Sequence, residues 1–293
     1  MANKELQQFG KGMAFLSPWL VGFLVFTLLP IVLSFYYSLC DYSVLQRPMY
    51  IGLDNYRELV NDGVFWLSLK NSLYYGAMAL PAGLIVSLGL AMLLNVKMPG
   101  QAIFRTIIFI PSLVPIVASA MLWMWLFNSR LGLINTLLEK VGIPGPNWLT
   151  DSRIAMPSLA LMSLWGVGNA MVIYLAGLQD VPKELYEAAE IDGAGVWGRM
   201  WNVTLPMLSP VIFFNLIMSI IGVLQNFDAP YIMTGGGPTR ATYFMALYLR
   251  DCAFLYLRMG FASAMAWIML VIVLILTGIA FWSSKRWVYY QGK

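Results

Sequence analysis

Six long stretches of this sequence contain no Asp, Glu, Lys or Arg, and this pattern constrains the fold more than any other feature. The charge-free stretches are 12–40, 71–96, 106–129, 154–179, 200–227 and 259–284, and each has at least 24 residues. About 20 apolar residues are enough to cross a bilayer as a helix. A charge at the bilayer centre costs about 2.5–3.5 kcal/mol, which explains why the charges gather between the stretches. We therefore expect an all-α integral membrane protein with six transmembrane helices.

The composition and the N-terminal sequence agree with this prediction. Of the 293 residues, 60% are hydrophobic and 11% are charged, whereas a soluble domain carries about 25% charged residues. The first apolar run is too long for the core of a signal peptide, about 7–15 residues, so it is expected to be a retained helix. The predicted organisation is a cytoplasmic N-terminal segment (1–12), a six-helix transmembrane domain (13–283) and a cytoplasmic C-terminal tail (284–293).

The charges between the stretches indicate the orientation only weakly. With the N-terminus inside, equal numbers of Lys and Arg fall on the two sides of the membrane. Lys285 and Arg286 directly follow the last stretch, as the positive-inside rule expects for a cytoplasmic end. The pattern favours both termini in the cytoplasm.

Local signals refine the outer half of this topology. Pro111 and Pro115 lie within the third stretch, so that span should be kinked. The segment 241–257 is rich in Tyr, Phe and Leu and is predicted to be a helix at the outer interface. Cys40 and Cys252 would both lie near the outer face, where they could form a disulfide or remain free, buried thiols.

The longest inner connection, 179–205, has the pattern of two short helices. Pro182 suits the first turn of a helix over 183–191. Gly193 and Gly195 would supply the stop and the turn, and a second helix over 196–202 would lead into the fifth span. Such a pair at the membrane surface suits docking into a groove of a soluble partner; the alternative is an ordinary solvated connector.

This loop also carries a resemblance to a known family. Its spacing is similar to the signature loop of permease subunits in binding-protein-dependent ABC importers, with Val203 where Ile is usual. Further stretches, 110–115, 132–135, 176–179 and 234–238, resemble the sugar-import branch, the maltose-type permeases. The loop residues that carry the resemblance, and to which it assigns coupling to an ATPase, are Glu187, Ala188, Ala189, Asp192, Gly193, Leu205 and Pro206.

The resemblance implies a type I ABC importer permease fold in a bacterial-type cytoplasmic (inner) membrane, with the 179–205 loop inside. It implies four kinds of neighbour: a second homologous permease subunit in a heterodimer, two ATPase subunits, an extracytoplasmic solute-binding protein and membrane lipid. The sequence contains no Gly-x-x-x-x-Gly-Lys-Ser/Thr pattern, so ATP and magnesium are expected on the ATPase subunits and no cofactor or enzyme activity in this chain. The net charge of +4 is ordinary for a membrane protein and gives no indication of nucleic-acid binding.

Uncharged polar residues inside the spans are the candidates for a substrate path. Asn215, Ser219 and Asn226 share one helical face. Amides and hydroxyls can pair with sugar hydroxyls, and an indole can stack on a pyranose. The alternative is that such residues join helices together, as small and amide residues do in membranes. The resemblance implies a path lined by Gly166, Asn169, Ser219 and Asn226, with Trp165 and Val223 beside it.

The expected function is the translocation pore of an ATP-driven importer for a sugar, oligosaccharide or glycoside. Met162 stands where the maltose subunit carries an amide, which puts maltose itself in doubt, and a glycerol-phosphate-type or other polar solute is an alternative. A secondary transporter or channel would need intramembrane carboxylates or an inverted repeat, and neither is found. An intramembrane enzyme lacks its commonest general base, because the sequence has no His.

Overall fold

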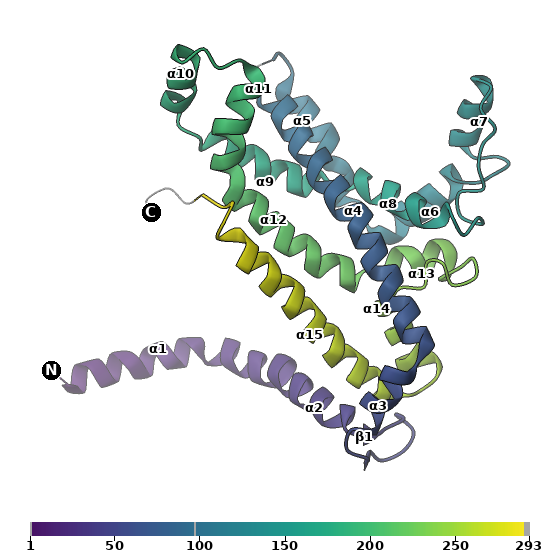
Figure 1. The fold of residues 1–293 in the computed structure, drawn as a ribbon. Coiled ribbons are helices and arrows are strands. Elements are labelled where there is room, and N and C mark those ends of the chain that lie inside the picture. Colours follow the sequence, from purple (N-terminus) through teal and green to yellow (C-terminus); the bar gives the residue numbers. More distant parts are fainter. Residues whose placement is uncertain (1, 97, 290–293) are drawn as a thin grey trace. The chain divides into compact units, whose positions relative to one another are not determined.

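The computed structural model describes residues 2–96 and 98–289, with only the backbone for 2–11. The chain divides into two compact units: residues 1–62 with 249–270 form unit 1, and residues 63–248 with 271–293 form unit 2. Figure 1 shows that both are built from helices. Met1 and residues 290–293, which belong to the predicted terminal segments, lie outside the described residues, as does Lys97.

Unit 1 contains the first apolar helix and a small two-stranded sheet. Asn55 fixes the loop after α2, since the buried amide donates hydrogen bonds to the carbonyls of Ser38 (3.0 Å) and Cys40 (2.9 Å). The two strands pair antiparallel, with Cys40 opposite Tyr50. The elements are α1 (Ala2–Phe23), η1 (Leu24–Leu28, π-helical), α2 (Leu29–Ser38), β1 (Cys40–Asp41), β2 (Met49–Tyr50), α3 (Asp54–Asn61), η4 (Asp251–Leu255, π-helical) and the first part of α15 (Met259–Ser284).

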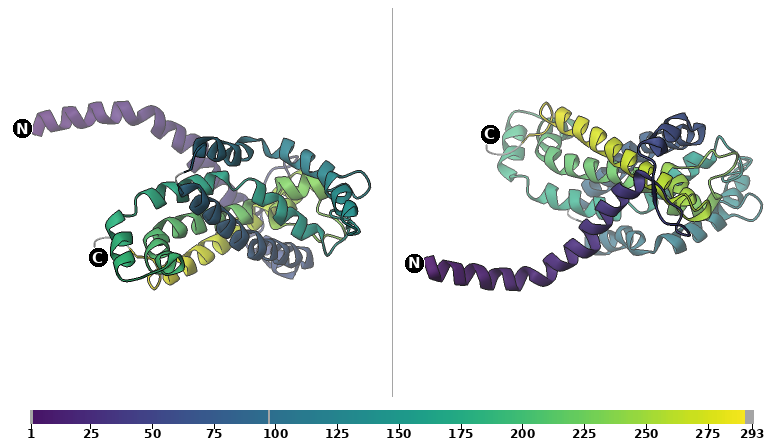
Figure 2. Two further views of the ribbon diagram at one scale, coloured as in Figure 1. Left: turned by 90° about the horizontal axis from the view of Figure 1, so that it is seen from above. Right: turned by 90° about the horizontal axis from the view of Figure 1, so that it is seen from below.

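Unit 2 is a helix bundle in which the long helix α4 is central. Helices α8, α9 and α12 all pack on α4, and Figure 2 shows them gathered around it. The elements are α4 (Gly63–Asn95), α5 (Gln101–Phe109), η2 (Ile110–Leu113, 3-10), α6 (Ile116–Leu126), α7 (Leu133–Lys140), α8 (Ala155–Trp165), α9 (Gly168–Gln179), α10 (Lys183–Ile191), α11 (Val196–Arg199), η3 (Met200–Thr204, π-helical), α12 (Leu205–Gln225), α13 (Asp228–Thr234), α14 (Met245–Arg250) and the second part of α15.

Six segments have the length and apolar composition of membrane spans, as the charge-free stretches predict. Four are unbroken: Gly12–Ser38, Gly63–Asn95, Val196–Gln225 and Met259–Ser284. The other two are bent pairs, Gln101–Leu113 with Ile116–Leu126 (99°) and Ala155–Trp165 with Gly168–Gln179 (50°). Counted as one span each, these pairs complete the predicted six-helix membrane fold.

The break in the third span follows from its prolines, which confirms the predicted kink. Val114 and Pro115 are extended, with ψ of 129° and 139°, so the helix ends at Leu113 and begins again at Ile116. A residue before proline avoids the helical region for steric reasons. Two consecutive extended residues therefore turn the chain sharply within the span.

The break in the fourth span was not predicted, because the apolar pattern over 154–178 is continuous. Gly166 and Val167 have ψ of 14° and 2°, which interrupts the helix before Gly168. A Cβ atom at Gly168 would lie 2.9 Å from both the Ile108 carbonyl oxygen and the Phe109 Cα. The glycine thus permits the fourth span to pack closely on the end of α5, just before the break in the third span.

Two expectations about segments between the spans are resolved. The segment 241–257 is helical only from Met245 to Leu255, and the prediction that it lies at an interface is wrong for its first part, because 243–248 are buried. Large aromatic and aliphatic side chains there fill the protein core instead. Cys40 and Cys252 are free and buried, as in the second of the two alternatives.

Candidate substrate path and coupling loop

A cavity of about 290 Å³ lies where the two broken spans meet. Its wall includes the predicted residues Trp165 and Gly166. Three serines, at 112, 119 and 163, add hydroxyl groups, and Met162 adds a thioether. None of the residues that the structure describes around this cavity is charged. The Ser112 and Ser163 hydroxyls already donate to the carbonyls of Phe109 and Ala160, so the lining offers an indole and hydroxyl oxygens that can accept from an uncharged polar solute.

Asn226 reaches the same region through a residue from another helix. It terminates α12 with an extended backbone (ψ 113°), and its side chain lies near the hydroxyl of Tyr75, as does that of Ser163. Tyr75 is only 4% exposed and comes from α4. Tyr75 is thus a neighbour of both Asn226 and a serine of the cavity wall.

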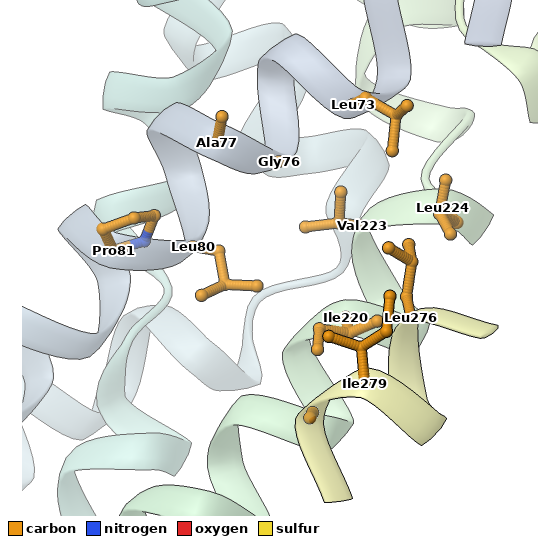
Figure 3. Close-up of a pocket in the computed structure, with 11 residues that line it drawn as sticks. Leu73, Gly76, Ala77, Leu80, Pro81, Ile220, Val223, Leu224, Leu276 and Ile279 are labelled. Atoms are coloured by element: carbon orange, nitrogen blue, oxygen red, sulfur yellow. The ribbon is translucent and has the colours of Figure 1, made fainter. Parts of the chain in front are cut away.

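The other predicted path residues are dispersed. Asn169 is exposed in the first turn of α9, and Ser219 is half-buried on α12. Val223 lines a different cavity, of about 400 Å³, between α4, α12 and α15. Figure 3 shows the side chains of Leu80, Ile220 and Val223 around this 400 Å³ cavity. Its described lining is wholly apolar, so it offers no hydrogen bonds to a sugar.

Asn215 behaves as a structural residue. It is 5% exposed, and its amide donates a 3.0 Å hydrogen bond to the Val211 carbonyl of its own helix. Sequence reasoning placed it on the same face as Ser219 and Asn226, but it is buried and its amide already donates a hydrogen bond within its own helix. The shared face therefore mixes a packing residue with candidate path residues.

Sequence reasoning missed Tyr75 and the serine hydroxyls. Ser163 stands only two residues before Trp165, so its closeness in sequence was an available signal. Ser112 lies beside a proline that was already singled out. Tyr75 had no such signal, because α4 meets the ends of α8 and α12 only in the folded bundle.

The first half of the candidate coupling loop folds as its sequence predicts. Helix α10 begins after Pro182, and Gly193 adopts a left-handed conformation with φ of 78°. The amide of Ala194 donates to the Ala189 carbonyl (2.9 Å) and that of Gly193 donates to the Glu190 carbonyl (3.0 Å), which is the Schellman pattern of helix termination. The loop therefore has a defined stop between its two helices.

Two side-chain contacts hold α10 against the start of the fifth span. The hydroxyls of Tyr186 and Thr204 lie 3.0 Å apart, and Arg199 pairs with Glu190 at 3.5 Å. Thr204 ends the π-helical turn η3, which runs directly into α12 at Leu205 and Pro206. The second predicted helix, 196–202, is thus the beginning of one continuous 30-residue helix rather than a separate element.

The surface of this loop combines acid and apolar side chains. Glu187, Ala188 and Asp192 are exposed and Ala189 is half-buried, while Ile191 and Trp197 are 87% and 74% exposed. Exposed apolar groups of this kind, with polar groups around them, mark protein interaction sites. The geometry suits attachment of a second protein.

Comparison with known proteins decides the family. Residues 79–289 match the family described as binding-protein-dependent transport system inner membrane components. The chain belongs to this family. It is thus a multi-pass transport component of the inner membrane, and the resemblance seen in the signature loop is confirmed.

Individual relatives cover nearly the whole chain. The probable ABC transporter permease protein YesP of Bacillus subtilis is 42% identical, over 96% of this chain and 93% of the relative. The trehalose/maltose transport system permease protein MalF of Thermococcus litoralis is 34% identical, over 91% and 90%. A crystal structure of a bacterial ABC transporter that imports the acidic polysaccharide alginate matches with a TM-score of 0.85 at 24% identity, over 97% and 98%. This last match shows the type I importer permease fold.

Proposed function

We propose that this chain is one half of the translocation pore of an ATP-driven importer for a sugar, oligosaccharide or glycoside. The observation that carries the proposal is the uncharged cavity at the two span breaks, with Trp165 and Gly166 in its wall and three serine hydroxyls around it. An indole face and hydroxyls are the groups that bind pyranose rings. The relative named for trehalose and maltose adds support from sequence.

The lining also separates the main proposal from its alternative. A glycerol-phosphate-type solute carries negative charge, which proteins bind with Arg, Lys or backbone amides at a helix N-terminus. No Lys or Arg occurs among the described residues around the cavity. A neutral saccharide therefore fits better than a phosphate ester.

The proposed partners are a second homologous permease subunit, two ATPase subunits and an extracytoplasmic solute-binding protein. ATP and magnesium belong to the ATPase subunits, which would receive α10 in a groove. The acidic and apolar surface around Glu187 and Ile191 supports this docking. Closure of the ATPase pair would then move α10 and, through the Tyr186–Thr204 contact, the start of the fifth span.

The proposed topology places the coupling loop and both termini in the cytoplasm, with segments 1–12 and 284–293 as cytoplasmic ends of the 13–283 domain. Six spans put 179–205 on one side and 235–238 on the other. In a background of Cys40→Ser and Cys252→Ser, the variants Ala194→Cys and Thr239→Cys should react oppositely with an impermeant thiol reagent on intact cells. Labelling of Ala194→Cys from outside would overturn the orientation.

Reconstitution tests the function itself. The chain purified alone should hydrolyse no ATP. Proteoliposomes with both permeases, the ATPase and the binding protein should take up at least one of trehalose, maltose, lactose and arabinotriose when ATP is present. Uptake of glycerol 3-phosphate but of none of these saccharides would favour the alternative.

A further inference from the structure

A second cavity with polar groups in its lining, of about 340 Å³, lies near the outer ends of the third and fifth spans. Its volume is within the usual range for ligand pockets, about 300–1,000 Å³. It is enclosed by the end of α6, residues 148–150 and the end of α13. Three chain segments therefore build it, and none of its described lining residues is charged.

One wall of this cavity is a tryptophan whose orientation is fixed. The Trp148 indole donates a 2.6 Å hydrogen bond to the Asn135 Oδ1 atom, and its ring stacks on Phe127 with centroids 5.2 Å apart. The Asn135 amide in turn donates to the carbonyls of Ser129 and Pro146. Because its N–H group is already paired, Trp148 has only its ring surface to offer a ligand.

Hydrogen-bonding groups surround this ring. The Asn128 Oδ1 atom accepts hydrogen bonds from the amides of Arg130 (3.0 Å) and Leu131 (2.9 Å), which leaves its amino group as a donor. The exposed residues Ser129 and Thr150 contribute hydroxyls to the same lining. An aromatic ring with uncharged donors and hydroxyls is the combination that also forms the cavity at the span breaks.

An aromatic column joins the two cavities. Trp165, in the wall of the first, contacts Trp123 (centroids 6.3 Å apart), Trp123 contacts Phe127 (5.0 Å), and Phe127 contacts Trp148 in the wall of the second. Phe127 is only 2% exposed, so the column is packed protein interior and a solute cannot bind along it. The two cavities thus lie at the two ends of one rigid element.

We propose that the outer cavity is a second saccharide subsite, which holds a neutral sugar ring against Trp148 as the solute enters the pore. The proposal rests on the proposed function, because only an importer of saccharides would use such a subsite. Asn128, Ser129 and Thr150 provide the polar contacts. The absence of charge in the described lining selects neutral sugars over acidic ones.

Thiol protection in the assembled importer tests the subsite. Ser129→Cys, in the Cys40→Ser, Cys252→Ser background, places a small thiol in the lining with little change of volume. The importer is held in nanodiscs with ATP and vanadate. The rate of labelling by a maleimide is measured with and without the panel sugar, which is whichever of trehalose, maltose, lactose and arabinotriose the proteoliposomes take up. We expect that sugar to slow labelling several-fold in a saturable manner, and trigalacturonate at the same concentration to leave the rate unchanged.

Two variants identify the site that gives the protection. Asn128→Asp keeps the Oδ1 acceptor for the backbone but removes the amino donor and adds charge, so half-protection should need about tenfold more sugar. Asn147→Asp makes the same change at an exposed residue of the same segment outside the lining and should leave protection unchanged.

The outcomes separate the two proposals. Uptake of a panel sugar with no protection of Ser129→Cys, or with equal protection in Asn128→Asp, overturns the subsite while the importer function stands. Protection by trigalacturonate as strong as that by the sugar overturns the selectivity for neutral rings. Uptake of none of the panel sugars contradicts the proposed function, and the subsite fails with it.

Discussion

The coupling loop and the cavity at the span breaks are built in opposite ways. The loop is local: one helix, one left-handed glycine and one Schellman turn occur within 15 residues, and its contacts stay near in sequence. The cavity is assembled from η2, α6 and the end of α8, with Tyr75 of α4 beside Ser163. Substitutions in the loop should therefore affect the transmission of movement, whereas substitutions at the cavity should affect packing or solute affinity according to the residue that is changed.

Gly193→Val should have the largest effect. A β-branched residue at φ of 78° is a steric outlier, so the stop between α10 and α11 should be lost. We expect uptake in proteoliposomes to fall at least tenfold, with stimulation of ATP hydrolysis by the loaded binding protein lost. Gly198→Val is the matched control, since Gly198 lies in α11 without a positive φ. Uptake equal to that of the parent in both variants would mean that the loop is only a connector.

Gly168→Ala should destabilise the cavity region. The added Cβ would meet backbone atoms at 2.9 Å, and overpacking of this kind costs about 1–3 kcal/mol. The melting temperature of the assembled complex should fall by several degrees. At Gly166 the nearest atom to an added Cβ is 3.8 Å away, so Gly166→Ala should melt like the parent. A lower melting temperature in Gly166→Ala alone would contradict the described packing of the two breaks.

Asn226→Ala and Asn169→Ala test the solute contacts. Each removes hydrogen bonds worth about 0.5–1.5 kcal/mol, so KM for uptake should rise by up to about tenfold while melting and stimulated ATP hydrolysis stay near the parent values. Asn215→Ala, which removes a buried amide bonded within its own helix, should instead lower the melting temperature. If uptake, ATP hydrolysis and melting temperature all fell in proportion in the first two variants, these residues would not be path residues.

Tyr75→Phe should have the smallest effect. It retains the buried ring and removes only the hydroxyl that lies near Asn226 and Ser163, so a rise in KM of a few-fold is expected. If Tyr75 orients Asn226, the effect of Asn226→Ala should become smaller in the Tyr75→Phe background. Full additivity of the two changes in a double-mutant cycle would show that Tyr75 does not act through Asn226.

The sequence predicted features whose cause lies within a few residues. Charge-free length located all six spans, two prolines located the 99° bend, and helix and glycine signals located α10 and its stop. It did not predict the second break, because a glycine inside a helical pattern is often tolerated. Only the packing of Gly168 against Ile108 and Phe109 distinguishes this region from such a helix. Tyr75 was missed for the same reason, since its partners are 88 and 151 residues away in the chain.

The paired breaks also determine how the protein can face its solvent. At each break the helix stops making its internal backbone hydrogen bonds, and hydrocarbon cannot satisfy the freed amide and carbonyl groups. Residues 110–116 and 165–168 must therefore face protein or water, whereas the uninterrupted helices tolerate lipid along their length. One face of the protein can therefore contact lipid and the face with the breaks cannot. This difference orients the subunit laterally within the bilayer even without a solute.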